Sequence, residues 1–61
     1  MKNYVFKGTK NGGSFGIGTD KNLKEIVEEL FDGERHIIDR DNLFGQVFVY
    51  TETERYQVLE Y

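Results

Sequence analysis

Ser14 and the single histidine, His36, are the residues of this chain that could act as a nucleophile and a general base. Catalysis would require both side chains to meet an aspartate in a shielded cleft, and nothing in their spacing brings them together. A chain of 61 residues is also too short to enclose such a cleft. Ser14 is better explained as the start of a strand and His36 as a partly buried strand residue. We therefore expect no enzymatic activity and no catalytic residue.

Two segments begin like ligand-binding loops, but neither has the required spacing. The glycine-rich segment 12–18 precedes a predicted helix, yet no Gly-Lys-Ser/Thr ends it and Asp20 would repel phosphate. Segment 39–41 opens like a calcium loop, yet Leu43 and Tyr50 stand where oxygen ligands are needed. The chain has no cysteine, which excludes disulfides and thiolate zinc sites. We expect neither a metal nor a cofactor.

The length allows a single small domain, residues 1–61. A domain of this size buries only about 60% of its unfolded surface, so its stability is marginal unless something reinforces it. No apolar run approaches the roughly 18 residues that span a bilayer, and no signal-peptide pattern opens the chain. We expect a cytoplasmic protein without membrane contact.

The net charge of −3 is unevenly distributed along the chain. Residues 1–24 contain all five lysines and one aspartate, a local charge of +4. Residues 25–61 contain ten acidic residues and all three arginines, a local charge of −7. Such segregation can steer a charged partner, unless the fold interleaves the two parts and cancels the field.

Hydrophobic periodicity predicts a hairpin followed by a helix. Alternation predicts strands over 3–7 and 14–19, joined by a glycine-rich turn at 8–13. An apolar stripe with helical spacing predicts a helix over 21–32. Asn22 and Glu25 match a capping box at its start, and Gly33 would end it in a left-handed conformation. The stripe consists of Leu23, Ile26, Val27, Leu30 and Phe31.

The remainder of the chain is rich in β-forming residues. We expect a short strand over 35–38, a turn at 39–42, and strands over 45–51 and 55–60. The fold class is therefore α+β: a small, mainly antiparallel sheet of four to five strands, with one helix packed on one face. The order ββαββ(β) suggests a β-grasp-like arrangement. The alternative is an open antiparallel sheet without a central parallel pair.

One helix cannot cover both faces of this sheet. The apolar run 47–50 points two side chains to each side, and the turn that follows leaves the register open. Val58 would pair with either Val49 or Phe48. In both registers the face away from the helix keeps large apolar groups, which usually mark a contact surface. We expect an apolar protein interface, in a homodimer or with another protein, formed by Val5, Phe48, Tyr50, Tyr56 and Tyr61.

The charges of the predicted helix oppose its macrodipole. Lys21 and Lys24 lie at the N-terminal end and acidic residues at the C-terminal end. The pairs Lys21–Glu25 and Lys24–Glu28 have i, i+4 spacing. The acidic residues form a stripe with helical spacing, which consists of Glu25, Glu28, Glu29 and Asp32. An acidic stripe of this kind is also typical of a helix face that is only solvated and contacts no partner.

We expect the function to be that of a small acidic protein-binding module. One form is an inhibitor of the phage or mobile-element type, in which carboxylates mimic DNA phosphates toward a nucleic-acid enzyme. Its acidic interface would consist of Glu25, Glu28, Glu29, Asp32, Glu52 and Glu54.

The alternative is a nucleic-acid-binding accessory protein that uses the basic N-terminal hairpin. Lys2, Lys7 and Lys10 would contact phosphates, and Tyr4 would stack on a base. Three lysines provide few phosphate contacts, and an acidic overall charge is unusual for such a domain.

Overall fold

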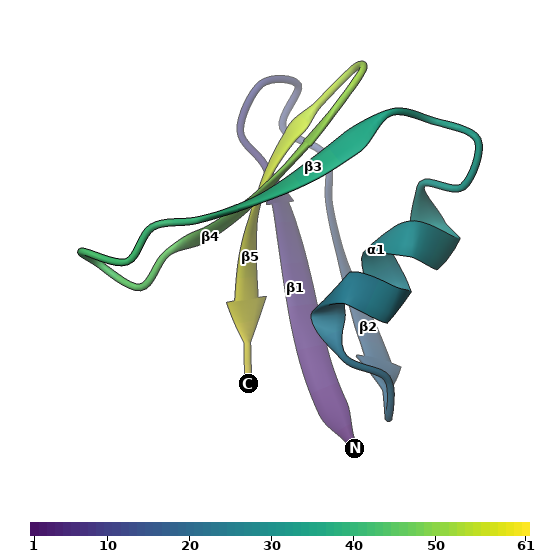
Figure 1. The fold of residues 1–61 in the computed structure, drawn as a ribbon, viewed down its shortest axis with the longest axis vertical. Coiled ribbons are helices and arrows are strands. Elements are labelled where there is room, and N and C mark those ends of the chain that lie inside the picture. The colour runs from purple at the N-terminus through teal and green to yellow at the C-terminus, as the bar shows by residue number, and fades with distance from the viewer.

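The computed structural model describes all residues, 1–61, as one five-stranded antiparallel sheet and one helix (Figure 1). The order of the strands across the sheet is β2-β1-β5-β4-β3. This confirms the α+β class. The single helix is too short and too polar to cross a membrane. The elements are β1 (Lys2–Gly8), β2 (Ser14–Thr19), α1 (Leu23–Leu30), β3 (His36–Arg40), β4 (Val47–Thr51) and β5 (Arg55–Glu60).

The first and last strands form the centre of the sheet. β1 and β5 pair antiparallel, with Phe6 opposite Val58. A β-grasp sheet has a parallel pair at this place, so the β-grasp likeness is not confirmed, and the open antiparallel sheet is the arrangement found. Helix α1 connects β2 at one edge of the sheet to β3 at the other edge.

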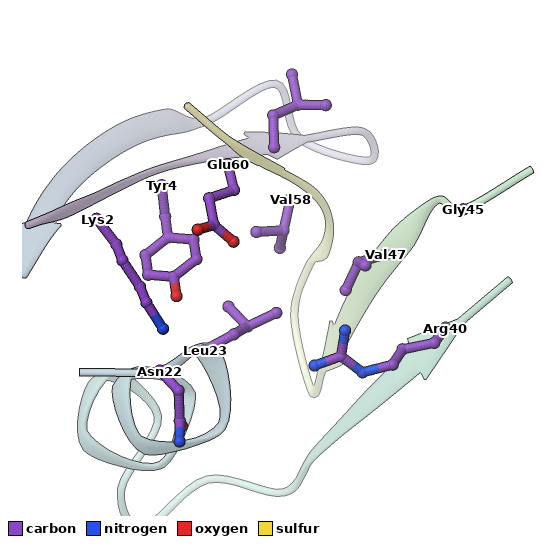
Figure 2. A pocket seen from close by; sticks show the side chains of 10 residues that line it. Lys2, Tyr4, Asn22, Leu23, Arg40, Gly45, Val47, Val58 and Glu60 are labelled. Atoms are coloured by element: carbon purple, nitrogen blue, oxygen red, sulfur yellow. The ribbon is translucent and has the colours of Figure 1, made fainter. Parts of the chain in front are cut away.

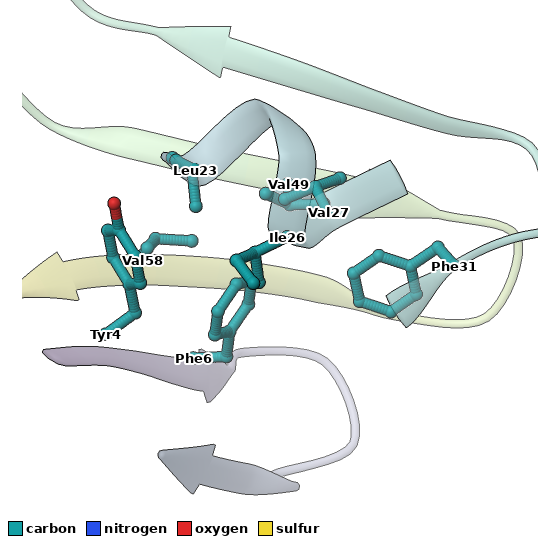
Figure 3. Close-up of a cluster of buried hydrophobic side chains, with 8 residues drawn as sticks. All are labelled: Tyr4, Phe6, Leu23, Ile26, Val27, Phe31, Val49 and Val58. Atoms are coloured by element: carbon teal, nitrogen blue, oxygen red, sulfur yellow. The ribbon is translucent and has the colours of Figure 1, made fainter. Parts of the chain in front are cut away.

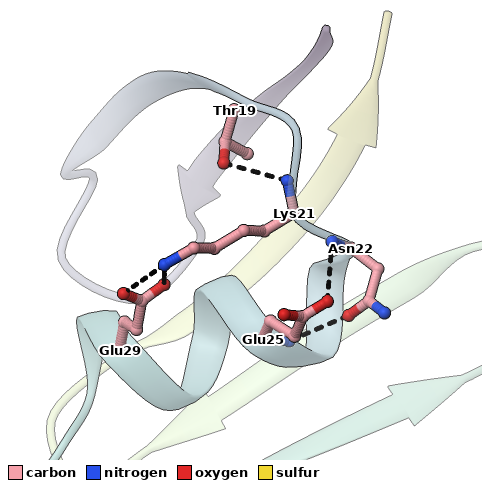
Figure 4. A network of polar contacts seen from close by, with 5 residues as sticks. All are labelled: Thr19, Lys21, Asn22, Glu25 and Glu29. Atoms are coloured by element: carbon pink, nitrogen blue, oxygen red, sulfur yellow. Dashed lines mark hydrogen bonds and ion pairs between the residues drawn. The ribbon is translucent and has the colours of Figure 1, made fainter.

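The start of α1 agrees with the prediction. The Asn22 Oδ1 atom accepts a hydrogen bond from the Glu25 N–H at 3.0 Å, and the Glu25 carboxylate accepts one from the Asn22 N–H at 3.5 Å (Figure 4). This reciprocal pair is the predicted capping box, and it makes Asn22 the last residue before the helix. Lys21 is therefore outside α1, although the prediction included it.

The helix also ends two residues earlier than predicted. The Phe31 N–H still donates to the Val27 carbonyl, but the Glu34 N–H donates to the Phe31 carbonyl, which forms a tighter turn. Gly33 lies in this turn with φ of 82°, a conformation that glycine adopts without strain. The predicted left-handed glycine is therefore present, in a turn that follows the helix.

Strand β3 extends to Arg40, so the predicted turn at 39–42 is displaced toward the C-terminus. Asp41 and Gln46 close the turn, because the Asp41 N–H donates to the Gln46 carbonyl at 2.8 Å. Gly45 has φ of 68° within it. The following strand consequently begins at Val47 instead of residue 45.

Both predicted registers of the last hairpin are wrong. Val58 pairs with Val47, and Gln57 pairs with Phe48. The Thr51 N–H donates to the Glu54 carbonyl at 2.9 Å, and the Thr51 hydroxyl accepts from the Glu54 N–H at 3.0 Å. These bonds close a two-residue turn, which sets the pairing of every residue in both strands.

The core lies between α1 and one face of the sheet (Figure 3). Phe6 at the sheet centre, Val27 on the helix and Val49 on β4 are fully buried. Burial of each such side chain contributes about 1.5–3 kcal/mol. The complete buried cluster is Tyr4, Phe6, Leu23, Ile26, Val27, Phe31, Val49 and Val58.

Candidate functional site

The face of the sheet opposite α1, which we call the open face, has no helix over it (Figure 1). Strand alternation places there the neighbours of the core residues. The register puts Val5 beside Leu59 on the two central strands, and Ile37 beside Tyr50 on the outer pair. Tyr50 is 36% exposed and Ile37 67% exposed. The apolar patch of the open face is Val5, Ile37, Phe48, Tyr50 and Leu59.

Arg55 supplies a cation next to this patch. Its guanidinium carbon lies 4.6 Å from the centroid of the Phe48 ring and 5.5 Å from that of Tyr50. A guanidinium over aromatic faces gains cation–π energy while it stays solvated. Aromatic rings and arginine are the side chains most enriched in protein contact surfaces. The open face therefore has the composition of an interface.

Two further charges lie on the open face, in one cross-strand row. Lys7 on β1 pairs with Gln57, Gln57 pairs with Phe48, and Phe48 pairs with Asp39 on β3. Lys7 and Asp39 are exposed, and neither forms an ion pair. The row thus has a cation at one end and a carboxylate at the other.

The residues predicted for the apolar interface do not all lie on one face of the sheet. Val5, Phe48 and Tyr50 lie together on the open face. Tyr61 lies just beyond β5, where its N–H donates to the Asn3 carbonyl at 2.8 Å, and it is 73% exposed. The prediction omitted Ile37 and Leu59, although alternation around the buried Val58 is a signal that identifies Leu59.

Tyr56 lies on the other face of the sheet from Val5, Phe48 and Tyr50. Its ring packs on the helix side of the sheet, 5.5 Å from the Phe31 ring centroid and 6.0 Å from that of Phe6. Burial raises the pKa of Tyr56 above 10.0, and the negative charges of Glu54 and Glu34 add to the effect. Alternation within β5 places Tyr56 on the same side as the buried Val58, and the register pairs it with the buried Val49.

The acidic stripe of α1 lies on the opposite side of the molecule from the open face. Four acidic residues and Lys21 surround a shallow hollow on the exposed side of the helix. Lys21 Nζ lies 2.6 and 2.7 Å from the two carboxylate oxygens of Glu29 (Figure 4). The expected pairs with i, i+4 spacing, Lys21–Glu25 and Lys24–Glu28, are not formed. The acids are Glu25, Glu28, Glu29 and Asp32.

Of the two acids predicted from the last hairpin, only Glu52 is exposed. Its carboxylate accepts a hydrogen bond from the Arg35 N–H at 3.1 Å, and its own N–H donates to Glu34 at 3.1 Å. Both contacts join the β4–β5 turn to the chain that precedes β3.

Glu54 is buried, so its assignment to an acidic interface is wrong. It is 7% exposed and accepts hydrogen bonds from the N–H groups of Lys10, Asn11 and Arg55 at 2.7–2.9 Å. Desolvation acts to raise its pKa, but these three bonds and the charge of Lys10 outweigh it, so the pKa of Glu54 lies below 4.5. Through these hydrogen bonds the Glu54 carboxylate connects the β4–β5 turn to the β1–β2 turn.

The residues proposed for nucleic-acid binding do not form one surface. Tyr4 is 3% exposed, and its hydroxyl donates to the Lys21 carbonyl at 3.4 Å, so it cannot stack on a base. Lys2 lines a pocket on the helix side, whereas Lys7 lies on the open face. Lys10 lies in the turn held by Glu54. Strand alternation alone indicates that Lys2 and Lys7 point to opposite faces.

A pocket of about 420 Å³ lies between the start of α1 and the sheet (Figure 2). Two cationic side chains, Lys2 and Arg40, and the carboxylate of Glu60 are among the groups that line it. None of the three forms an ion pair. Because Glu60 offsets part of the cationic charge, the lining is not a site of a single sign.

Ser14 and His36 are far apart. Ser14 lies on β2 at one edge of the sheet and His36 on β3 at the other. The His36 Nδ1 atom lies 2.8 Å from the Glu34 carbonyl. The two side chains therefore do not form a nucleophile–base pair.

The chain matches no protein-family model, and comparison with curated proteins and with solved structures finds no match.

Proposed function

We propose that this chain is a non-catalytic protein-binding module whose contact surface is the open face of its sheet. The observation that carries the proposal is the apolar patch, on a sheet face that no other element covers. Phe48 and Tyr50 supply aromatic contact surface. The Arg55 guanidinium lies over both rings and supplies a cation that a partner could contact. An apolar patch with polar surroundings is the usual arrangement of a protein contact.

The acidic helix supports selection by charge as a secondary feature of the same function. Glu28 and Asp32 are exposed and without an ion pair, so they are free to meet a basic partner. The DNA-mimic form of the proposal has less support than the open face. Glu54 is buried, and Lys21 neutralises Glu29.

Nucleic-acid binding has one favourable observation, also on the open face. Lys7 and Arg55 lie on the same face as two aromatic rings, which is a small version of a stacking platform. Two cations provide little phosphate affinity, and this remains the second candidate.

The test compares wild-type chain with open-face variants in a pull-down followed by mass spectrometry and cross-linking of the captured species. We expect Phe48→Glu and Ile37→Glu to lose the partner, because each places a carboxylate in the apolar contact. Ile37 is exposed enough for its variant to fold. Leu43→Glu makes the same type of change in an exposed turn, and should retain the partner.

Capture that survives both open-face changes would contradict the proposal. A parallel titration with labelled single-stranded oligonucleotide at low salt tests the second candidate. Binding there, lost in Phe48→Glu, would favour nucleic acid over protein.

A further inference from the structure

The charges of the open face have an arrangement that suits one partner in particular. Lys7 and Asp39 end the same cross-strand row, on β1 and β3. Adjacent strands lie about 4.8 Å apart, so three steps separate the two residues by about 14 Å. They cannot pair within one copy of the chain. They can pair between two copies if the row is reversed in the second copy.

A two-fold axis that runs along the strands, between β4 and β5, produces this reversal. It exchanges β4 with β5 and β3 with β1, and it turns the two open faces toward each other. Lys7 of each copy then faces Asp39 of the other, and Arg55 faces Tyr50. Such a rotation keeps the hand of the sheet twist, so the two twisted surfaces have complementary shapes, as in aligned sheet sandwiches.

We propose that the partner of the open face is a second copy of this chain, packed face to face about this axis. The inference rests on the protein-binding function proposed above and specifies the partner. Each dimer would contain two Lys7–Asp39 contacts around the buried apolar patches.

The size and charge of the molecule are compatible with this dimer. A standard interface buries about 800 Å² per partner. The total accessible surface is 4315 Å², so a contact of that size would cover about a fifth of the surface of each copy. The two acidic helices lie on the outer sides of the sandwich, so their like charges stay separated. A second sheet layer would also reinforce a chain without disulfides.

The first test is charge reversal, measured by sedimentation equilibrium from micromolar to millimolar concentration. Lys7→Glu and Asp39→Lys should each raise the dimer dissociation constant about tenfold or more, because like charges then face each other. The double variant should return to within about threefold of wild type. Lys24→Glu, the same change on the exposed side of α1, should leave the constant unchanged.

The second test uses the absence of cysteine from the chain. Lys7→Cys and Asp39→Cys variants, mixed and oxidised, should form a disulfide-linked dimer. The double variant should form no disulfide within one copy, because its Cα atoms exceed the limit of about 7 Å. Asp39→Cys mixed with Lys24→Cys should form little cross-linked dimer.

The outcomes separate this inference from the function on which it rests. A wild-type chain that is monomeric at every concentration overturns the self-association alone, and the open-face pull-down still judges protein binding. A dimer that the double charge swap fails to restore overturns the proposed axis. A dimer broken by Lys24→Glu but not by Lys7→Glu places the contact on the helix and overturns the face-to-face dimer, and the open-face pull-down again judges protein binding.

Discussion

The carboxylate of Glu54 accepts a hydrogen bond from the backbone N–H of Asn11 at 2.9 Å, across a sequence separation of 43 residues. The side-chain amide of Asn11 donates a second bond, to the Thr53 carbonyl at 2.8 Å. These contacts join the turns of the two hairpins, at the end of the sheet where β1 and β5 are neighbours.

Glu54→Gln should destabilise the protein. Three N–H donors converge on the two oxygens of Glu54, and the amide nitrogen of glutamine would face one of them. An unsatisfied buried group lowers the melting temperature of a domain this small by roughly 5–10 °C. Glu52→Gln is the matched control, since glutamine can still accept its single bond from Arg35. Circular-dichroism melting measures both variants. Equal shifts in melting temperature would contradict the proposal that the Glu54 carboxylate stabilises the contact between the two turns.

Stability should fall when the pH is lowered through the titration of Glu54. Its folded pKa lies below the ordinary value of 4.5, so the carboxylate binds protons more readily in the unfolded chain. The contribution is complete above about pH 4.5 and is lost as the pH falls through the folded pKa. Urea unfolding between pH 3 and 7 should show this loss in wild type and a flatter profile in Glu54→Gln. If the free energy of unfolding changed with pH in the same way in both proteins, groups other than Glu54 would cause the loss of stability at low pH.

Gly8→Ala should destabilise the first hairpin. A Cβ atom at Gly8 would overlap the backbone carbonyl oxygen of Gly13 and lie 2.6 Å from the Glu54 carboxylate. Overpacking against backbone typically costs about 1–3 kcal/mol in the free energy of unfolding. Gly13→Ala is the control, because a Cβ there meets nothing within 4 Å. Chemical denaturation should give a lower free energy of unfolding for Gly8→Ala than for Gly13→Ala. Similar free energies for the two variants would show that the turn shifts to accommodate the added Cβ atom.

Asn22→Ala should weaken α1. The substitution removes the oxygen that accepts from the Glu25 N–H, and loss of such a cap costs about 1 kcal/mol. Asn42→Ala, in an exposed turn, should have little effect. A reduced helical signal at intermediate urea concentration would identify α1 as the affected element. An unchanged unfolding midpoint would mean that tertiary packing alone holds the start of the helix.

The positions of the helix and of several strands are determined by residues that are close to each other in the sequence. The spacing of Leu23, Ile26 and Val27 predicts the buried side of α1, and Asn22 with Glu25 predicts where it begins. Alternation predicts the two strands of the first hairpin and the last strand. These features can be predicted from the sequence because they depend on residues within about four positions of each other. This holds for the helix period, the strand period and the capping hydrogen bonds.

Tertiary structure decided the composition of the two faces and the role of Glu54. The two-residue turn between Thr51 and Glu54 set the hairpin register, which brought Tyr56 to the core side, beside Val49. A slip of one residue would have reversed every such assignment, and no local pattern distinguishes the registers. Glu54 became a structural clamp because its three donors come from both hairpin turns. The charge and spacing of a residue are encoded locally, but its burial depends on which distant segment packs against it.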